Sequence, residues 1–142
     1  MSMLNAQTAV EIRKRFEALR DPVKLVVFSQ SLSAPELCAQ NEALMRDLAA
    51  LDDRLSVEVL NPAIDRERAE AYGITAVPAT VVEGARDYGI RFLGVPGGYE
   101  FSAFLDAVLV ASTGEPALSP ETRQALAGLE QDTEIKVFST PT

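Results

Sequence analysis

The residues from Val23 to Phe28 constrain the fold of this chain more than any other feature. The run Val-Lys-Leu-Val-Val-Phe is short, rich in β-branched side chains and almost wholly apolar. Such a run is typical of a strand inside a sheet whose two faces are both covered. We therefore expect it to form the central strand of a sheet, with other elements packed on both faces.

A helix and a second strand are predicted after this run. Ser33 is suited to cap the helix, Pro35 is tolerated in its first turn, and Glu36 completes a Ser-x-x-Glu capping box. The residues expected on its buried side are Leu37, Leu44, Leu48 and Leu51. Residues 55–60 alternate apolar and polar side chains, which predicts a strand. Because a helix joins the two strands, we expect them to be parallel, in a βαβ unit.

Further helices and strands are predicted on either side of this unit. They are a helix over residues 5–19, a short helix over residues 65–72, an antiparallel hairpin of residues 78–82 and 90–94, and a helix that begins near Phe101 and ends near Gly114. The predicted order over residues 1–114 is α-βαβ-α-ββ-α. This order is an α/β plan in one domain.

Residues 115–142 carry the pattern of an additional helix and strand. Ser119 and Pro120 mark the start of a helix, and residues 134–138 alternate like a strand. A strand without its own sheet must find a free sheet edge, in its own molecule or in a neighbour. If the natural chain ends with this strand, we expect a homodimer or strand exchange through residues 134–138.

The composition argues against several classes of function. The 142 residues include 13 Lys and Arg against 21 Asp and Glu, a net charge of −8, so we expect neither nucleic acid nor a membrane as a partner. The absence of histidine excludes Ser-His-Asp and Cys-His catalysis. The single cysteine, Cys38, excludes an intramolecular disulfide and a zinc site built from paired cysteines. No acidic spacing resembles a calcium loop, and we expect no metal and no other cofactor.

The first residues contain no basic segment that leads into an apolar stretch, and no apolar run is as long as a membrane span. We therefore expect a cytoplasmic protein.

Several stretches of the sequence resemble a known family. They are Pro22–Phe28, Tyr72–Thr80, Tyr88–Phe101 and Val137–Thr142. They resemble the N-terminal thioredoxin-like unit of the two-unit protein disulfide oxidoreductases, also called glutaredoxin-like proteins. Less closely, they resemble the N-terminal domain of the alkyl hydroperoxide reductase flavoprotein subunit. The resemblance implies a thioredoxin-like fold, a role in cell redox homeostasis, and residues 115–142 as the start of a second unit.

The resemblance also implies a Cys-x-x-Cys motif at the start of the helix after the first strand. Residues Pro35, Glu36, Leu37 and Cys38 occupy those four positions. Pro35 replaces the first cysteine, which is the nucleophile in such enzymes, and Cys38 retains the second, the resolving thiol. Thiol–disulfide exchange by this route needs both thiols. We therefore expect a degenerate active-site turn, a chain that is inactive alone, and a role in docking or scaffolding for chemistry located in a redox partner domain.

Two alternatives remain open at this stage. Cys38 is either a small buried hydrophobic residue or the thiol of a single-cysteine redox protein that works with an external thiol such as glutathione. The resemblance further implies that Pro78 is cis and that the backbone of Val77 pairs with an extended peptide. The protein would then bind protein or peptide thiols, or act as a peptide-binding module. A proline that merely opens an edge strand would need no ligand.

Overall fold

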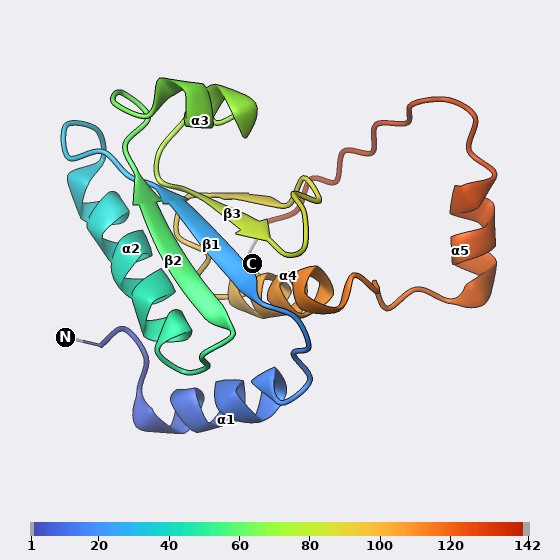
Figure 1. The fold of residues 1–142 in the computed structure, drawn as a ribbon, viewed down its shortest axis with the longest axis horizontal. Helices are drawn as coiled ribbons and strands as arrows, with labels where there is room; N and C mark the ends of the chain where they lie inside the picture. The colour runs from blue at the N-terminus through green and yellow to red at the C-terminus, as the bar shows by residue number, and fades with distance from the viewer. Residues whose placement is uncertain (1, 141–142) are drawn as a thin grey trace.

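The computed structural model describes residues 2–140, and it contains helices and strands in the predicted order. The elements are α1 (Ala6–Phe16), β1 (Val23–Phe28), α2 (Pro35–Ala49), β2 (Leu55–Leu60), α3 (Arg66–Ala71), β3 (Ala79–Glu83), β4 (Arg91–Leu93), α4 (Glu100–Thr113) and α5 (Pro120–Ala127) (Figure 1). The α-βαβ-α-ββ-α plan from α1 to α4 is confirmed.

The four strands form one sheet in the order β2-β1-β3-β4, so β1 is an internal strand as predicted. It pairs in parallel with β2 from Val23↔Leu55 to Phe28↔Leu60, and it pairs antiparallel with β3. β3 and β4 form the predicted antiparallel hairpin. Burial of β1 explains its composition, because Val26 and Val27 face opposite sides of the sheet and both have no exposed surface.

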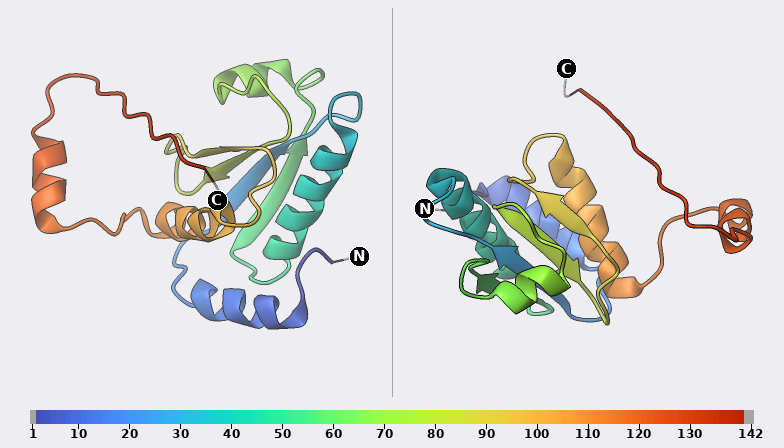
Figure 2. Two further views of the ribbon diagram at one scale, coloured as in Figure 1. Left: turned by 180° about the vertical axis from the view of Figure 1, so that it is seen from behind. Right: turned by 90° about the horizontal axis from the view of Figure 1, so that it is seen from above.

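Helices cover both faces of the sheet (Figure 2). Helices α1, α2 and α4 pack on one face, and the short α3 packs on the other. The larger cluster includes Phe16, Met45 and Phe104, each without exposed surface. The smaller cluster joins Phe28 and Val81 to Ala69 of α3. The sheet is therefore enclosed, as the apolar composition of β1 requires.

The C-terminal end of α1 is fastened to the sheet by Arg54, which lies just before β2. Its guanidinium donates hydrogen bonds to the backbone carbonyls of Phe16 and Leu19. It also pairs with the Asp52 carboxylate at 2.7 Å, and this side-chain hydrogen bond lowers the pKa of Asp52 below its usual value. Helix ends leave carbonyls without intrahelical partners, and Arg54 satisfies two of those near the end of α1. Leu19 lies beyond the helix, which is shorter than predicted, but it is still buried.

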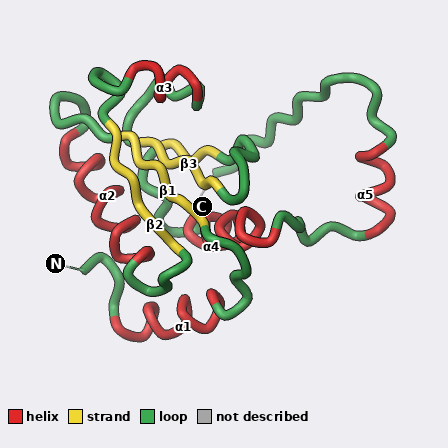
Figure 3. The backbone as a smooth tube through the Cα atoms, in the orientation of Figure 1, coloured by secondary structure: helices red, strands yellow, loops and turns green. Residues whose placement is uncertain are grey.

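The segment after α4 is the part of the chain where the structure departs from expectation. Helix α5 forms at the predicted place, with the Ser119 hydroxyl accepting a hydrogen bond from the Thr122 amide. It stands away from the sheet in each view, and no residue of it is buried (Figures 1 and 2). The predicted strand over residues 134–138 is wrong for this single chain, because the segment continues as loop (Figure 3). It lies beside no sheet edge, and a strand forms only when its backbone groups are paired.

Candidate functional site

The turn that leads into α2 differs from the capping arrangement predicted for it. The helix begins at Pro35, and the residue before it, Ala34, adopts a left-handed conformation with φ of 48°. No side chain caps the helix, so the capping prediction for Ser33 and Glu36 is wrong. The left-handed residue moves the helix start one position along the chain. The Ser33 carbonyl instead accepts a hydrogen bond from the Cys38 Sγ, at 3.5 Å.

The residues at the four motif positions differ sharply in exposure. Pro35 and Glu36 are exposed in the first turn of the helix, and Cys38 is only 2% exposed. Leu37, which was predicted to be buried, is 49% exposed, although it stands seven residues before the buried Leu44 and so on nearly the same side of α2. The exposed helix start, where a nucleophilic thiol would be activated, therefore carries a proline, and the thiol of Cys38 is shielded from solvent.

The Val77–Pro78 peptide bond is cis, as expected. Pro78 is buried at the start of β3, Val77 is half-buried, and the Pro78 carbonyl accepts a hydrogen bond from the Gly94 amide at 2.8 Å. Within residues 2–140 the Val77 amide donates no hydrogen bond. The Val77 backbone thus lies at the edge of the loop with its donor unused.

A buried polar pair connects the two parts of this site, and the sequence analysis missed it. The side-chain amide of Asn41, one turn beyond Cys38, donates to the Thr80 hydroxyl of β3 at 2.9 Å. Both residues have no exposed surface, and Asn41 Oδ1 has no partner in the described part of the chain. The signal was present, because a polar residue at 41 interrupts the apolar spacing from 38 to 44 and 45. This bond holds the start of α2 against the strand that follows Pro78.

Exposed apolar side chains gather at the same end of the sheet. The sheet register places the end of β1 beside the start of β3 and the end of β4, since Phe28 pairs with Ala79 and Ala79 pairs with Leu93. Large exposed apolar residues in the adjoining loops, at the end of β4 and in the first turn of α2 are Leu32 (91% exposed), Leu37 (49%), Leu93 (62%) and Tyr99 (86%), which we term the apolar rim. Isolated exposed apolar residues are ordinary, but four of them at one end of a sheet make this end a candidate interaction surface.

The strongly shifted pKa values lie away from this turn, in ion pairs on the β3–β4 side and beside α3. A hydrogen bond from Arg91 lowers the pKa of Asp87 to about 2. The Arg68 guanidinium likewise lowers the pKa of Glu58 through two hydrogen bonds of 3.0 Å. These pairs tie neighbouring elements together and do not converge on Cys38.

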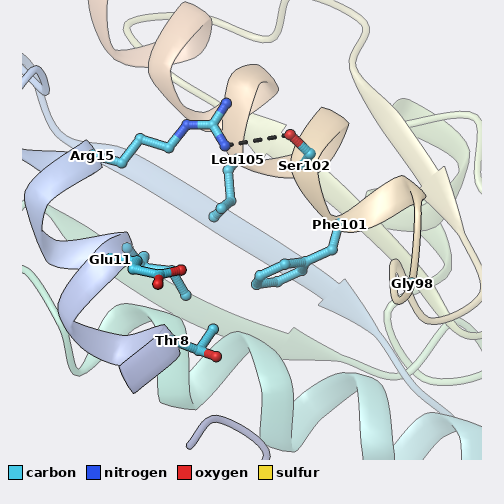
Figure 4. A pocket seen from close by; sticks show the side chains of 8 residues that line it. Thr8, Glu11, Arg15, Gly98, Phe101, Ser102 and Leu105 are labelled. Atoms are coloured by element: carbon cyan, nitrogen blue, oxygen red, sulfur yellow. Dashed lines mark hydrogen bonds between the residues drawn. The ribbon is translucent and has the colours of Figure 1, made fainter. Parts of the chain in front are cut away.

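A shallow groove of about 260 Å³ lies between α1 and α4 (Figure 4). Ile12, Phe101 and Leu105 form its apolar lining, and Glu11 and Arg15 stand at its margin. Arg15 is already engaged, since its guanidinium pairs with Asp106 and contacts the Ser102 hydroxyl at 3.4 Å. The groove shares no residue with the turn that leads into α2 or with the Val77–Pro78 loop.

Residues 2–140 contain neither a cluster of metal-binding side chains nor a membrane-spanning helix. No group of three or more acidic or cysteine side chains in that range is arranged to hold a metal ion. None of the helices there has the length and apolarity that a bilayer crossing requires.

Curated relatives show the family of this chain. A "Probable Thioredoxin" of Methanothermobacter marburgensis is 34% identical over 87 residues, which are 61% of this chain and 96% of that protein. This chain belongs to the thioredoxin family. A second "Probable Thioredoxin", from Methanothermobacter thermautotrophicus, is 40% identical over 55 residues, 38% of this chain and 60% of that one. No protein-family model matches the sequence.

Solved structures agree with the thioredoxin-like fold. The alkylhydroperoxide reductase protein AhpF of Enterococcus faecalis superposes with a TM-score of 0.79 at 21% identity, over 89% of this chain and 61% of that one. A protein disulfide oxidoreductase from Aeropyrum pernix gives a TM-score of 0.77 at 23% identity, over 91% of this chain and 56% of that one. The chain thus spans less than two thirds of either protein, and at these identities the likeness concerns the fold.

Proposed function

We propose that this chain is a redox-degenerate thioredoxin module, which docks protein or peptide thiols while the exchanging dithiol lies in a partner domain. One observation carries the proposal. Pro35 occupies the exposed first position of α2, and the chain's single thiol, Cys38, is 2% exposed. Disulfide exchange requires an attacking thiolate that forms a mixed disulfide and a second thiol that resolves it. Proline supplies no sulfur for the first step.

The environment of Cys38 supports a structural role. Its Sγ donates to the Ser33 carbonyl, and the residue lies on the buried side of α2 together with Asn41 and Leu44. A buried free cysteine behaves as a small apolar side chain whose thiol does not meet reagents. A single-cysteine redox enzyme would need this thiol at the surface.

The surface around Val77 supports the docking part of the proposal. An extended peptide can pair with an unused backbone donor, while pockets or apolar neighbours hold its side chains. Val77 offers such a donor, and Leu93 and Leu37 of the apolar rim adjoin the same end of the sheet. The proposed ligand is therefore an extended segment with apolar side chains beside its thiol or disulfide.

The redox part of the proposal is tested by restoring the missing sulfur with Pro35→Cys. Residues three apart in a helix have neighbouring side chains, so the introduced thiol can form a disulfide with Cys38. The unaltered chain is expected to leave a disulfide substrate such as insulin unreduced in the presence of dithiothreitol, beyond the rate of dithiothreitol alone. The Pro35→Cys variant is expected to accelerate the reaction. Pro35→Ser and the double change Pro35→Cys with Cys38→Ala serve as controls without a dithiol.

Two outcomes would contradict the redox part. Acceleration by the unaltered chain that disappears in Cys38→Ser would make it a single-cysteine redox protein. A folded Pro35→Cys variant that forms no disulfide would mean that more than residue 35 separates this turn from an active one.

The docking part is tested with an unfolded apolar peptide and two matched variants. Leu93 of the apolar rim is 62% exposed, and Val10 on α1 is 63% exposed. Peptide addition is expected to shift the amide resonances around Val77, Leu93→Glu to weaken binding, and Val10→Glu to leave it unchanged. Equal effects of the two substitutions would show that the apolar rim is not the docking surface.

A further inference from the structure

We infer that residues 134–138, termed here the tail segment, add as a strand to the free edge of β2 in a second copy of this chain. Reciprocal addition would give a two-fold homodimer. The tail segment is the most exposed apolar part of the structure, with Ile135 at 79%, Val137 at 84% and Phe138 at 90% exposure. Its backbone forms no helix or strand within the chain, so its hydrogen-bonding groups are free to pair with a sheet edge.

The composition of the tail segment suits an edge strand. It repeats the pattern of β1 at a distance of 110 residues, with Ile135, Val137 and Phe138 corresponding to Leu25, Val27 and Phe28. The correspondence fails at Lys136, which stands where β1 has the fully buried Val26. A lysine cannot replace a valine that has no exposed surface in the middle of a covered sheet, but it is common on edge strands, where it reaches water.

The edge of β2 is the better of the two edges that the sheet offers. Strand β2 is six residues long, whereas β4, at the other edge, has only three residues. Val57 and Val59 on β2 pack against the larger cluster but remain half-buried at this edge. An added strand with Ile135 and Val137 on that face would complete their burial, which is the main stabilising contribution of strand addition.

The charges on the other face of β2 are compatible with the tail segment. Glu58 of β2 lies between two cations, with Arg68 at 3.0 Å and Lys24 at 3.8 Å, so this group carries one positive charge in excess. Alternation along a strand puts Glu134 and Lys136 on the face opposite Ile135, and these two side chains already pair at 3.3 Å in the single chain. The added strand therefore brings an ion pair without net charge to this face. Its Glu134 carboxylate can interact with the positive charge that Glu58 leaves uncompensated on Lys24 and Arg68.

The experiment measures the mass of the 142-residue chain by light scattering across a concentration series, together with amide hydrogen exchange. We expect a concentration-dependent dimer in which the amides of β2 and of the tail segment gain protection together. Ile135→Pro removes a backbone donor and should raise the dimer dissociation constant at least about tenfold. Gln131→Pro, in the same exposed stretch but outside the tail segment, should leave it unchanged.

A monomer at all concentrations would overturn the inference. A monomer with a protected β2 edge would show that the tail segment folds back on its own sheet, which also overturns it. A dimer that survives Ile135→Pro would place the interface elsewhere. Leu93→Glu, which tests the docking surface, lies on the opposite edge strand and should not change the mass, so the two proposals fail independently.

Discussion

Helix α1 with strand β1, and helix α5 with the tail segment, are two regions with the same pattern of apolar residues and opposite burial. The aligned pairs stand 110 residues apart: Phe16 and Leu126, Leu19 and Leu129, Leu25 and Ile135, Val27 and Val137, Phe28 and Phe138. The first member of every pair is at most 4% exposed, whereas the second is at least 48% exposed. The same pattern therefore gives a core in one place and an exposed surface in the other.

The difference separates the structure that a segment forms by itself from the structure that needs a neighbouring element. Both helices are capped, α1 by Asn5 and α5 by Ser119, and the backbone hydrogen bonds of a helix join residues of the same segment. Only β1 becomes a strand, because a strand needs the backbone of a neighbour, which β2 and β3 supply. Most of the stability of α1 must then come from its contacts with the sheet.

The largest effect that would test this comparison is expected from truncating the paired residues Phe16 and Leu126. Phe16→Ala empties a position with no exposed surface and should cost about 3–5 kcal/mol of unfolding free energy. Leu126→Ala, at a position 48% exposed, should change it by no more than about 0.5 kcal/mol. Urea unfolding followed by circular dichroism measures both. Similar losses for the two variants would mean that α5 is packed in solution.

The second largest effect on stability is expected from Arg54, which attaches the C-terminal end of α1 to the sheet. Arg54→Gln removes charged hydrogen bonds to the carbonyls of Phe16 and Leu19 and should lower the midpoint of urea unfolding by about 0.5 M. Arg123 likewise donates to the carbonyls of Pro116 and Leu118, but beside an exposed helix. Arg123→Gln should therefore leave urea unfolding unchanged. A larger loss for Arg123→Gln than for Arg54→Gln would reverse the comparison.

The partner of Arg54 gives a pH-dependent version of the same test. Arg54 lowers the pKa of Asp52 in the folded protein below its ordinary value of 3.8, so the folded state favours the carboxylate. This contribution is complete above the unfolded pKa and is lost as pH falls through the lower folded value. Asp52→Asn should destabilise the protein at pH 7 by about 1 kcal/mol, and the difference from the unaltered chain should shrink below about pH 4. A difference that stays constant down to pH 2 would contradict the assigned ion pair.

The smallest effect is expected at the two caps. Asn5 Oδ1 accepts from the Thr8 amide at 2.8 Å, and Ser119 Oγ accepts from the Thr122 amide at 3.2 Å. Asn5→Ala should cost about 0.5–1 kcal/mol in global unfolding, since α1 is part of the core. Ser119→Ala should leave global unfolding unchanged and reduce only the helical chemical shifts of residues 120–127. Global destabilisation by Ser119→Ala would show that α5 unfolds together with the domain.

The sequence predicted correctly those elements whose local residue pattern matches their burial in the folded chain. The composition of β1 predicted an internal strand, and the helix between β1 and β2 predicted their parallel pairing, both of which the structure confirms. The strand over residues 134–138 was predicted from alternation alone, which does not reveal whether a neighbour exists. Similarly, the predicted cap at Ser33 was wrong because Ala34 adopts a left-handed conformation. Glycine or asparagine at that position would have indicated this conformation, but alanine does not.

The candidate site was predicted in outline. The resemblance supplied Pro35 and Cys38 as motif positions and Pro78 as the cis residue, but the sequence could not decide whether Cys38 is buried. The bond between Asn41 and Thr80 joins residues 39 positions apart, and only the folded sheet brings them together. The exposure of Leu37 could not be read from helical spacing, because the first turn of α2 projects beyond the sheet.

The reactivity of Cys38 tests the central claim most directly. The rate of its reaction with a chromogenic disulfide reagent would be measured in the native protein and again in urea. A structural thiol that is 2% exposed should react at least about a hundredfold more slowly in the native state, with full reactivity on unfolding. A native rate equal to or above the unfolded rate would contradict the account, because it would make Cys38 an accessible, activated thiol and the chain a single-cysteine redox protein.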